Sequence, residues 1–246
     1  RGEEADFTEE AGRQWMGKHF EDTPQLQEDI QGRPMLIGAV GGLLSYLHQT
    51  QKNDLRQINR LEVYTKAQFM GLDPAARRNL ELCQVMRSGE KKGSLLWVLD
   101  HTRTAMGGRL LRQWLEKPLV NAAQIALRQN AVQALLGDRP RRDGVLEGLR
   151  GVFDLERLIS RVVYGSANCR DLRSLWQTAC AIPQVKENLE GFGGSQYLKE
   201  LWEEIDCLED VAGLIDRAIS TEPPFSLREG NLLREGFDEK IDQLRD

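Results

Sequence analysis

From Asp73 onward, the sequence repeats one arrangement: a residue that can cap a helix precedes apolar side chains at helical spacing. Asp73-Pro74 places a capping carboxylate before a proline at the first helical position, where the missing N–H is tolerated. This helix is predicted to run to about Met86. Further helices are predicted at 104–116, 121–136, from 154, from 168, from 195 and at 208–219. Their motif residues follow no fixed period, so an irregular helical array is favoured over a solenoid.

The predicted helix from Thr104 to Glu116 is amphipathic. Met106, Leu110 and Trp114 recur at i+4 spacing and are expected to be buried, so that Leu110→Ala would cost about 2–5 kcal/mol. Gly107-Gly108 favours close helix packing over a phosphate contact, because each helical glycine costs about 1 kcal/mol relative to alanine. The later helices have similar predicted buried faces, formed by Leu155, Leu158, Ile159 and Val162, by Leu172, Leu175, Trp176 and Ala179, and by Leu198, Leu201, Trp202 and Ile205.

The first 67 residues differ from this pattern and indicate a mixed α/β region. Helices are predicted at Thr8–His19 and Pro34–Gln49, and short β-like segments at Arg60–Tyr64 and Gln68–Leu72. These strands are too few for a closed sheet, which predicts an incomplete domain. The expected fold is therefore mainly α: an irregular helical array preceded by a partial α/β domain.

The charge balance limits what the chain can bind. Its formal net charge of -5 argues against a segment devoted to coating a nucleic-acid backbone. The basic cluster Arg139, Arg141 and Arg142 is expected in an exposed loop between helices, with a phosphate contact as the less favoured alternative. Any DNA contact made by this stretch should therefore be minor.

No motif in the sequence carries chemistry of its own. There is no G-x-x-x-x-G-K-[ST] loop for nucleotide phosphates and no C-x-x-C pair for a metal. The four cysteines are expected to be reduced packing residues, as in a reducing compartment. The most apolar run, Met35–Leu44, is too short to span a bilayer. The chain starts at Arg1 without methionine or a leader and ends at Asp246 within a helical pattern, which suggests an interior piece of a longer protein.

Several short motifs occur along the chain in a characteristic order. The segment Leu72–Leu82 is followed by motifs at 93–96, 99–100, 102–107, 109–111, 114–115, 118–119, 154–158 and 170–172. In order and spacing they resemble the lever, or core, domain of the MutS family of DNA mismatch repair proteins, although the family usually has threonine at the position of Ala76. Residues 43–47 and 50–52 are similar to the end of the family's connector domain, and 223–238 to the approach to its clamp. The matching signature, expected to be structural, comprises Asn79, Leu80, Glu81, Thr102, Thr104, Met106, Gly107, Arg109, Leu110, Trp114, Pro118, Asp154, Leu155, Arg157 and Asp171.

The resemblance implies a role as well as a fold. Residues 1–67 would be the C-terminal part of a connector and 68–246 the first part of the lever. The parent would be a homodimeric ATPase of the bacterial cytosol, associated with the nucleoid. It would use ATP and magnesium, recognise mismatched duplex DNA and recruit a MutL-type partner. This stretch would contribute no catalytic residue, cofactor or metal site; it would link the ATPase to the DNA-holding domains. The alternative is a helical protein-interaction scaffold unrelated to DNA.

Overall fold

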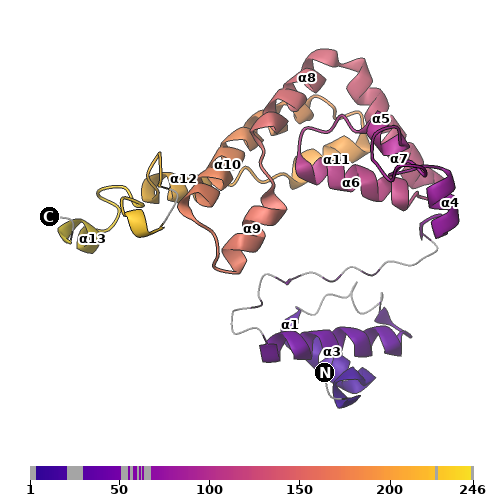
Figure 1. The fold of residues 1–246 in the computed structure, drawn as a ribbon, viewed down its shortest axis with the longest axis horizontal. Coiled ribbons are helices and arrows are strands. Elements are labelled where there is room, and N and C mark those ends of the chain that lie inside the picture. Colours follow the sequence, from indigo (N-terminus) through magenta and orange to yellow (C-terminus); the bar gives the residue numbers. More distant parts are fainter. Residues whose placement is uncertain are drawn as a thin grey trace. The chain divides into compact units, whose positions relative to one another are not determined.

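The computed structural model describes residues 4–20, 30–50, 55, 58, 59, 61, 63, 68–224 and 227–244. The chain divides into two compact units, Arg1–Thr65 and Lys66–Asp246 (Figure 1). The mainly α fold expected from the sequence is confirmed. Within the described residues, β pairing is confined to two isolated antiparallel bridges, Phe69–Leu119 and Ile219–Leu233. No described helix is both long and apolar enough to cross a membrane.

The first unit is built on two helices in backbone contact. It contains η1 (Glu4–Phe7), α1 (Glu9–His19) and α3 (Pro34–Thr50). Thr8 caps α1 by accepting a hydrogen bond from the Ala11 amide at 3.2 Å. Glycines allow the approach, because a Cβ on Gly41 would lie 2.3 Å from the Cα of Gly12. The core beside this contact is formed by Met16, Phe20, Ile30, Ile37 and Leu44.

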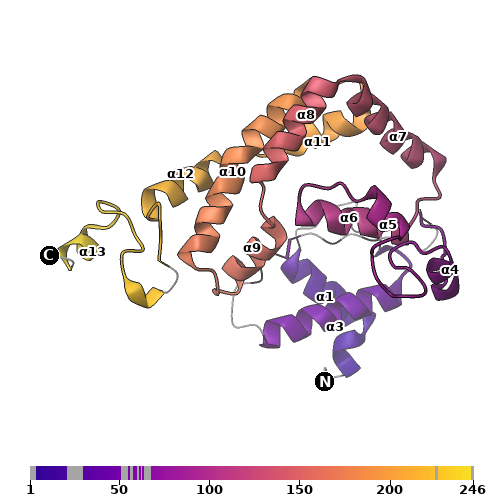
Figure 2. The ribbon, with the colours of Figure 1, turned by 45° about the horizontal axis from the view of Figure 1, so that its top comes forward.

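The second unit is a succession of helices, most of them joined by short connections, with longer segments before α5 and after α12 (Figure 2). In chain order they are α4 (Pro74–Asn79), α5 (Leu95–Leu99), α6 (Ala105–Glu116), α7 (Ala122–Gly137), α8 (Arg139–Gly148), η3 (Leu149–Gly151), α9 (Leu155–Val163), α10 (Cys169–Glu190), α11 (Gln196–Glu204), α12 (Glu209–Ala218), η4 (Leu227–Glu229) and α13 (Glu239–Gln243). The predicted caps at Asp73, Thr104, Asn121 and Asp154 each accept hydrogen bonds from first-turn amides.

The long helix α10 has a core cluster at each of its ends. Toward its C-terminus, Val185 and Leu189 pack with Ala131 of α7 and Leu198 of α11, and α8 lies alongside (Figure 1). Toward its N-terminus, the cluster is formed with α12 by Cys169, Ile215, Ala218 and Ile219, with Leu172, Leu175 and Trp176 packed against it. The helix therefore connects two separately packed regions of the unit.

One predicted helix boundary and one predicted loop are wrong. The helix that opens at Asp73 ends at Asn79 instead of Met86, because Glu81 adopts a left-handed conformation with φ 47. The Glu81 carbonyl then accepts from the amide of Leu95 at 3.1 Å, which joins this turn to the start of α5. The basic cluster is also wrong as a loop, since it forms the first turn of α8. Asp138 caps that helix by accepting from the Arg141 amide, and Pro140 in the first turn has no N–H that would need a partner.

Two expected features before α4 are not observed as strands. At Gln68–Leu72 only Phe69 pairs, with Leu119, so this segment is a single bridge. The β-like segment at Arg60–Tyr64 lies largely outside the described residues, where only 61 and 63 are described and neither is in a strand. The described secondary-structure elements of the first unit are all helices, so its assignment as an α/β connector stays a prediction.

Some predicted buried faces are open in this chain. Leu110 is 47% exposed, Ile159 51% and Val162 44%, although Leu158 is buried at 7%. On α6, the half-buried face is offset from the predicted stripe and holds Leu111 and Leu115 together with Met106 and Trp114. The expected 2–5 kcal/mol for Leu110→Ala is therefore too large for this chain, since that cost applies to a buried leucine.

Candidate functional site

The start of α6 is held by a network of short polar contacts. Asp100 pairs with Lys91 and accepts from the Thr102 hydroxyl at 2.6 Å, while Thr104 caps the helix by accepting from the Gly107 amide at 3.0 Å. The hydrogen bonds from Lys91 and Thr102 lower the pKa of Asp100 to about 2. A Cβ on Gly107 would lie 3.1 Å from the Thr104 hydroxyl. The expected packing of the glycine pair against another helix is therefore corrected to contact with this capping loop.

One arginine of α6 joins that helix to α9, 45 residues later. Arg109 donates two hydrogen bonds to Asp154, at 2.7 and 2.8 Å, and two to Glu156, at 2.5 and 2.9 Å. Asp154 also caps α9 through the Arg157 amide at 3.4 Å. The hydrogen bond between Arg109 and Asp154 raises the pKa of the guanidinium and lowers that of the carboxyl. We call Arg109, Asp154 and Glu156 the first junction.

A second arginine joins the end of α9 to the start of α10. Arg161 donates to the Oδ1 of Asp171 at 2.6 Å, and Asp171 is only 9% exposed. Asp171 is also half of a capping box: its Oδ2 accepts from the Asn168 amide at 3.1 Å, and its own amide donates to the Asn168 side chain at 2.8 Å. We call Arg161 and Asp171 the second junction.

Polar contacts continue from α10 into α12 and the residues that follow it. Arg173 of α10 donates to Asp216 of α12 at 3.1 Å, and Arg234 donates to the same oxygen at 3.0 Å. At the other end of the series, the guanidinium of Arg128 on α7 lies 3.7 Å from the centre of the Trp114 ring on α6. Arginine and aspartate pairs thus occur at the successive contacts α6–α9, α9–α10 and α10–α12.

The predicted signature residues are distributed unevenly over this arrangement. Arg109, Asp154 and Arg157 meet at the first junction, whereas Asp171 belongs to the second. Thr102, Thr104 and Gly107 form the capping loop of α6, with Met106 and Trp114 half-buried on that helix and Leu155 half-buried at the start of α9. The Glu81 side chain accepts from the Met86 amide at 2.8 Å and the Pro118 carbonyl from the Met70 amide at 2.8 Å. The exposed members are Asn79, Leu80, Thr102, Arg109, Leu110 and Arg157, and of these Asn79, Leu80 and Leu110 belong to neither the junctions nor the capping loop.

Sequence reasoning missed several members of these contacts. Glu156 and Arg161 were assigned no role, and neither was Asp216 nor Arg234. Only the helix-capping positions carried a local signal, because a carboxylate three residues after Asn168 is the pattern of a capping box. The partners across the junctions are separated by 10 to 47 residues, so spacing alone does not identify them.

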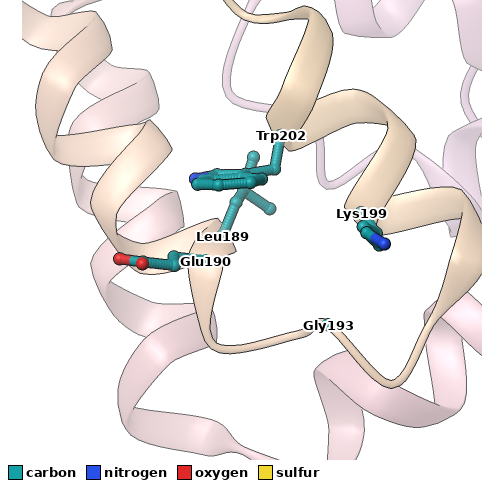
Figure 3. Close-up of a pocket in the computed structure, with 5 residues that line it drawn as sticks. All are labelled: Leu189, Glu190, Gly193, Lys199 and Trp202. Atoms are coloured by element: carbon teal, nitrogen blue, oxygen red, sulfur yellow. The ribbon is translucent and has the colours of Figure 1, made fainter.

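Two hollows lie in the described part of the second unit, and the larger, of about 570 Å³, is lined by acidic side chains around the end of α11 and the start of α12. One pocket of about 170 Å³ lies between α10 and α11. Figure 3 shows Trp202 lying over Leu189, while the charged ends of Glu190 and Lys199 point away from each other. Among the described residues, no group of three His, Cys, Asp or Glu side chains is placed to hold a metal ion. The four cysteines are free thiols.

Comparison with known proteins identifies the family. The family MutS domain III matches residues 75–245, which is more than two thirds of the chain and includes both junctions. The chain belongs to the MutS family. A DNA mismatch repair protein MutS from Ruminiclostridium cellulolyticum is 45% identical over 94% of the chain and 26% of that relative. Proteins of the same name from Halothermothrix orenii and Streptococcus sanguinis are 41% and 42% identical over 93% and 92% of the chain.

Membership of the MutS family places the described contacts within one known domain. The chain spans about a quarter of the length of these relatives, at 25% to 26% of each. The region matched to domain III corresponds to the second unit, which begins at Lys66. The helical array expected from the resemblance is therefore a segment of a mismatch repair protein, and a scaffold unrelated to DNA is not favoured.

Proposed function

We propose that this chain is the coupling segment of a MutS-type mismatch recognition ATPase, linking the ATPase to the domains that hold DNA. The observation that supports this role is the unbroken series of contacts from α6 through α9 and α10 to α12. The second unit has helices that are packed or bridged to one another, and no constellation of reactive side chains was found among its described residues. Such an arrangement suits the transmission of a displacement better than chemistry.

The activity of the whole protein follows as part of the same proposal. The parent would hydrolyse ATP with magnesium, recognise mismatched duplex DNA, act as a homodimer and recruit a MutL-type partner in the bacterial cytosol, near the nucleoid. The relatives that support this proposal are named DNA mismatch repair protein MutS. The net charge of -5 and the absence of a P-loop in the sequence favour a segment that transmits the parent's signals.

The test loosens the packing of α10 in the full-length protein. Leu189 is 8% exposed and packs with Val185, Phe192 and Leu198, so Leu189→Ala should cost about 2–5 kcal/mol and soften the contact between α10 and α11. Leu110→Ala removes the same atoms from a site that is 47% exposed in this chain, and it is the matched control when urea unfolding of the full-length protein shows a cost of about 1 kcal/mol or less. The measurement is the ATPase rate with and without a mismatched duplex, at a temperature where circular dichroism shows both variants folded.

The proposal predicts different outcomes for the two variants. Leu189→Ala should retain basal ATP hydrolysis but lose part of its response to the mismatch, whereas Leu110→Ala should respond as the unchanged protein does. A folded Leu189→Ala protein with a normal ratio of the two rates would refute the coupling role.

A further inference from the structure

Helix α9 is a short element with little apolar burial of its own. Of its residues only Leu158 is buried, and Ile159 and Val162 are 51% and 44% exposed. In both views the helix lies between α6 and the N-terminal end of α10 (Figures 1 and 2). Because non-directional apolar packing is limited here, the contacts at its two ends decide where α9 sits.

Each end of α9 is tied by an aspartate that performs two tasks. Asp154 receives the fork of Arg109 and also caps the first turn of α9. Asp171 receives Arg161 and completes the capping box of α10. A carboxylate that binds both a neighbouring guanidinium and a helical amide links the direction of the helix to the position of that neighbour.

The first junction is also geometrically restrictive. The guanidinium of Arg109 meets both oxygens of Asp154, at 2.7 and 2.8 Å, and this two-bond geometry fixes orientation as well as distance. Arg112, one turn further along α6, instead pairs with Glu116 of its own helix at 2.9 Å. Of these two arginines on α6, Arg109 therefore bonds to another element, whereas Arg112 bonds within its own helix.

We infer that Arg109 and Arg161 are positioning residues, and that α9 transmits movement between α6 and α10 through the two junctions in series. The inference rests on the proposed coupling function and adds its route. A displacement of α6 pulls Asp154 and the first turn of α9 with it, and the far end of α9 then moves the start of α10 through Arg161. Loss of either junction interrupts the same route.

The test uses the full-length protein and the ratio of ATPase rates with a G·T-mismatched and a fully paired duplex. Arg109→Gln and Arg161→Gln each remove one junction. Asp154→Asn removes the charge but keeps a good helix cap, because asparagine and aspartate cap about equally well. Each variant should reduce the ratio by about 2- to 30-fold, the range for residues that carry coupling, with basal hydrolysis retained. In the double variant Arg109→Gln/Arg161→Gln, the ratio should fall no further than it does in whichever single variant has the lower ratio.

Controls separate a positioning role from a general loss of charge or stability. Arg112→Gln removes an ion pair within α6 and should leave the ratio unchanged. Arg109→Lys should restore part of the ratio, since lysine keeps the charge but not the two-bond geometry. Circular dichroism and amide hydrogen exchange of α9 and α10 must show that each variant is folded.

Every result decides for or against the route. Unchanged ratios in folded Arg109→Gln and Arg161→Gln, an equal loss in Arg112→Gln, or losses that multiply in the double variant would overturn it. If Leu189→Ala still lowers the ratio in that case, the coupling function stands and only the route through α9 is wrong. If Leu189→Ala also leaves the ratio unchanged, the coupling function itself fails.

Discussion

Leu158→Ala and Leu110→Ala should differ sharply in stability, although the sequence predicts both leucines to be buried. Leu158 is 7% exposed, so its truncation loses nearly the whole transfer free energy and leaves a cavity, for a total of about 2–4 kcal/mol. Leu110 is 47% exposed, so about half of the transfer term is lost and no enclosed cavity forms. Its cost should be about 1 kcal/mol or less.

Urea unfolding of the 246-residue chain, followed by circular dichroism, measures both free energies of unfolding. In a separate thermal unfolding experiment, the midpoint of the transition assigned to the second unit should fall by roughly 4–16 °C for Leu158→Ala, since 1 kcal/mol corresponds to about 2–4 °C in a unit of this size. Equal costs for the two variants would refute the burial difference between α6 and α9. A larger cost for Leu110→Ala in the full-length protein than in this chain would show that another segment covers that residue.

Three further predictions concern other parts of the chain. Gly41→Ala should destabilise the first unit by about 1–3 kcal/mol because its Cβ would meet the backbone of Gly12, whereas Gly17→Ala, with open space around it, should be neutral or stabilising; hydrogen exchange of α1 and α3 distinguishes them. Because the pKa of Asp100 is lowered from 3.8 to about 2, its stabilising effect should be full above about pH 4 and vanish as the pH falls through about 2; an NMR titration midpoint near 4 would contradict this. Iodoacetamide should modify exposed Cys180 before Cys169 and Cys83, whose burial raises the pKa of each thiol; mass spectrometry showing the reverse order would contradict it.

Several helices were predictable from local signals, although α8 was missed even though Asp138 caps it through the amide of Arg141. Thr104 and Asn121 cap helices through amides two or three residues away, so the relevant contacts are contained in short stretches of sequence. The end of α4 was not predictable in this way. It depends on the left-handed Glu81, whose carbonyl binds the amide of Leu95 fourteen positions later. A cap residue is visible in sequence, but a distant partner that terminates a helix is not.

Burial was predicted less well than the helices, because it too depends on partners that are distant in sequence. Periodicity shows that Leu110 shares a face with Met106 and Trp114, and that Ile159 shares one with Leu158. It does not show whether the partner of that face lies in the same 246 residues. Since the chain spans about a quarter of its relatives' length, an apolar stripe need not be covered within it.

The junctions also engage arginines that could otherwise contact a nucleic-acid backbone. Arg109, Arg161 and Arg173 each face a carboxylate on another helix, at 2.5 to 3.1 Å. The basic cluster of α8 is paired too, since Arg139 and Arg142 face Asp143 at 3.5 and 3.4 Å, and Arg141 faces Asp138 at 3.5 Å. A phosphate would have to displace these carboxylates in a chain whose net charge is already -5. These positive charges are therefore engaged by carboxylates, both within helices and between them, and the pairs between helices hold elements that apolar packing leaves partly open.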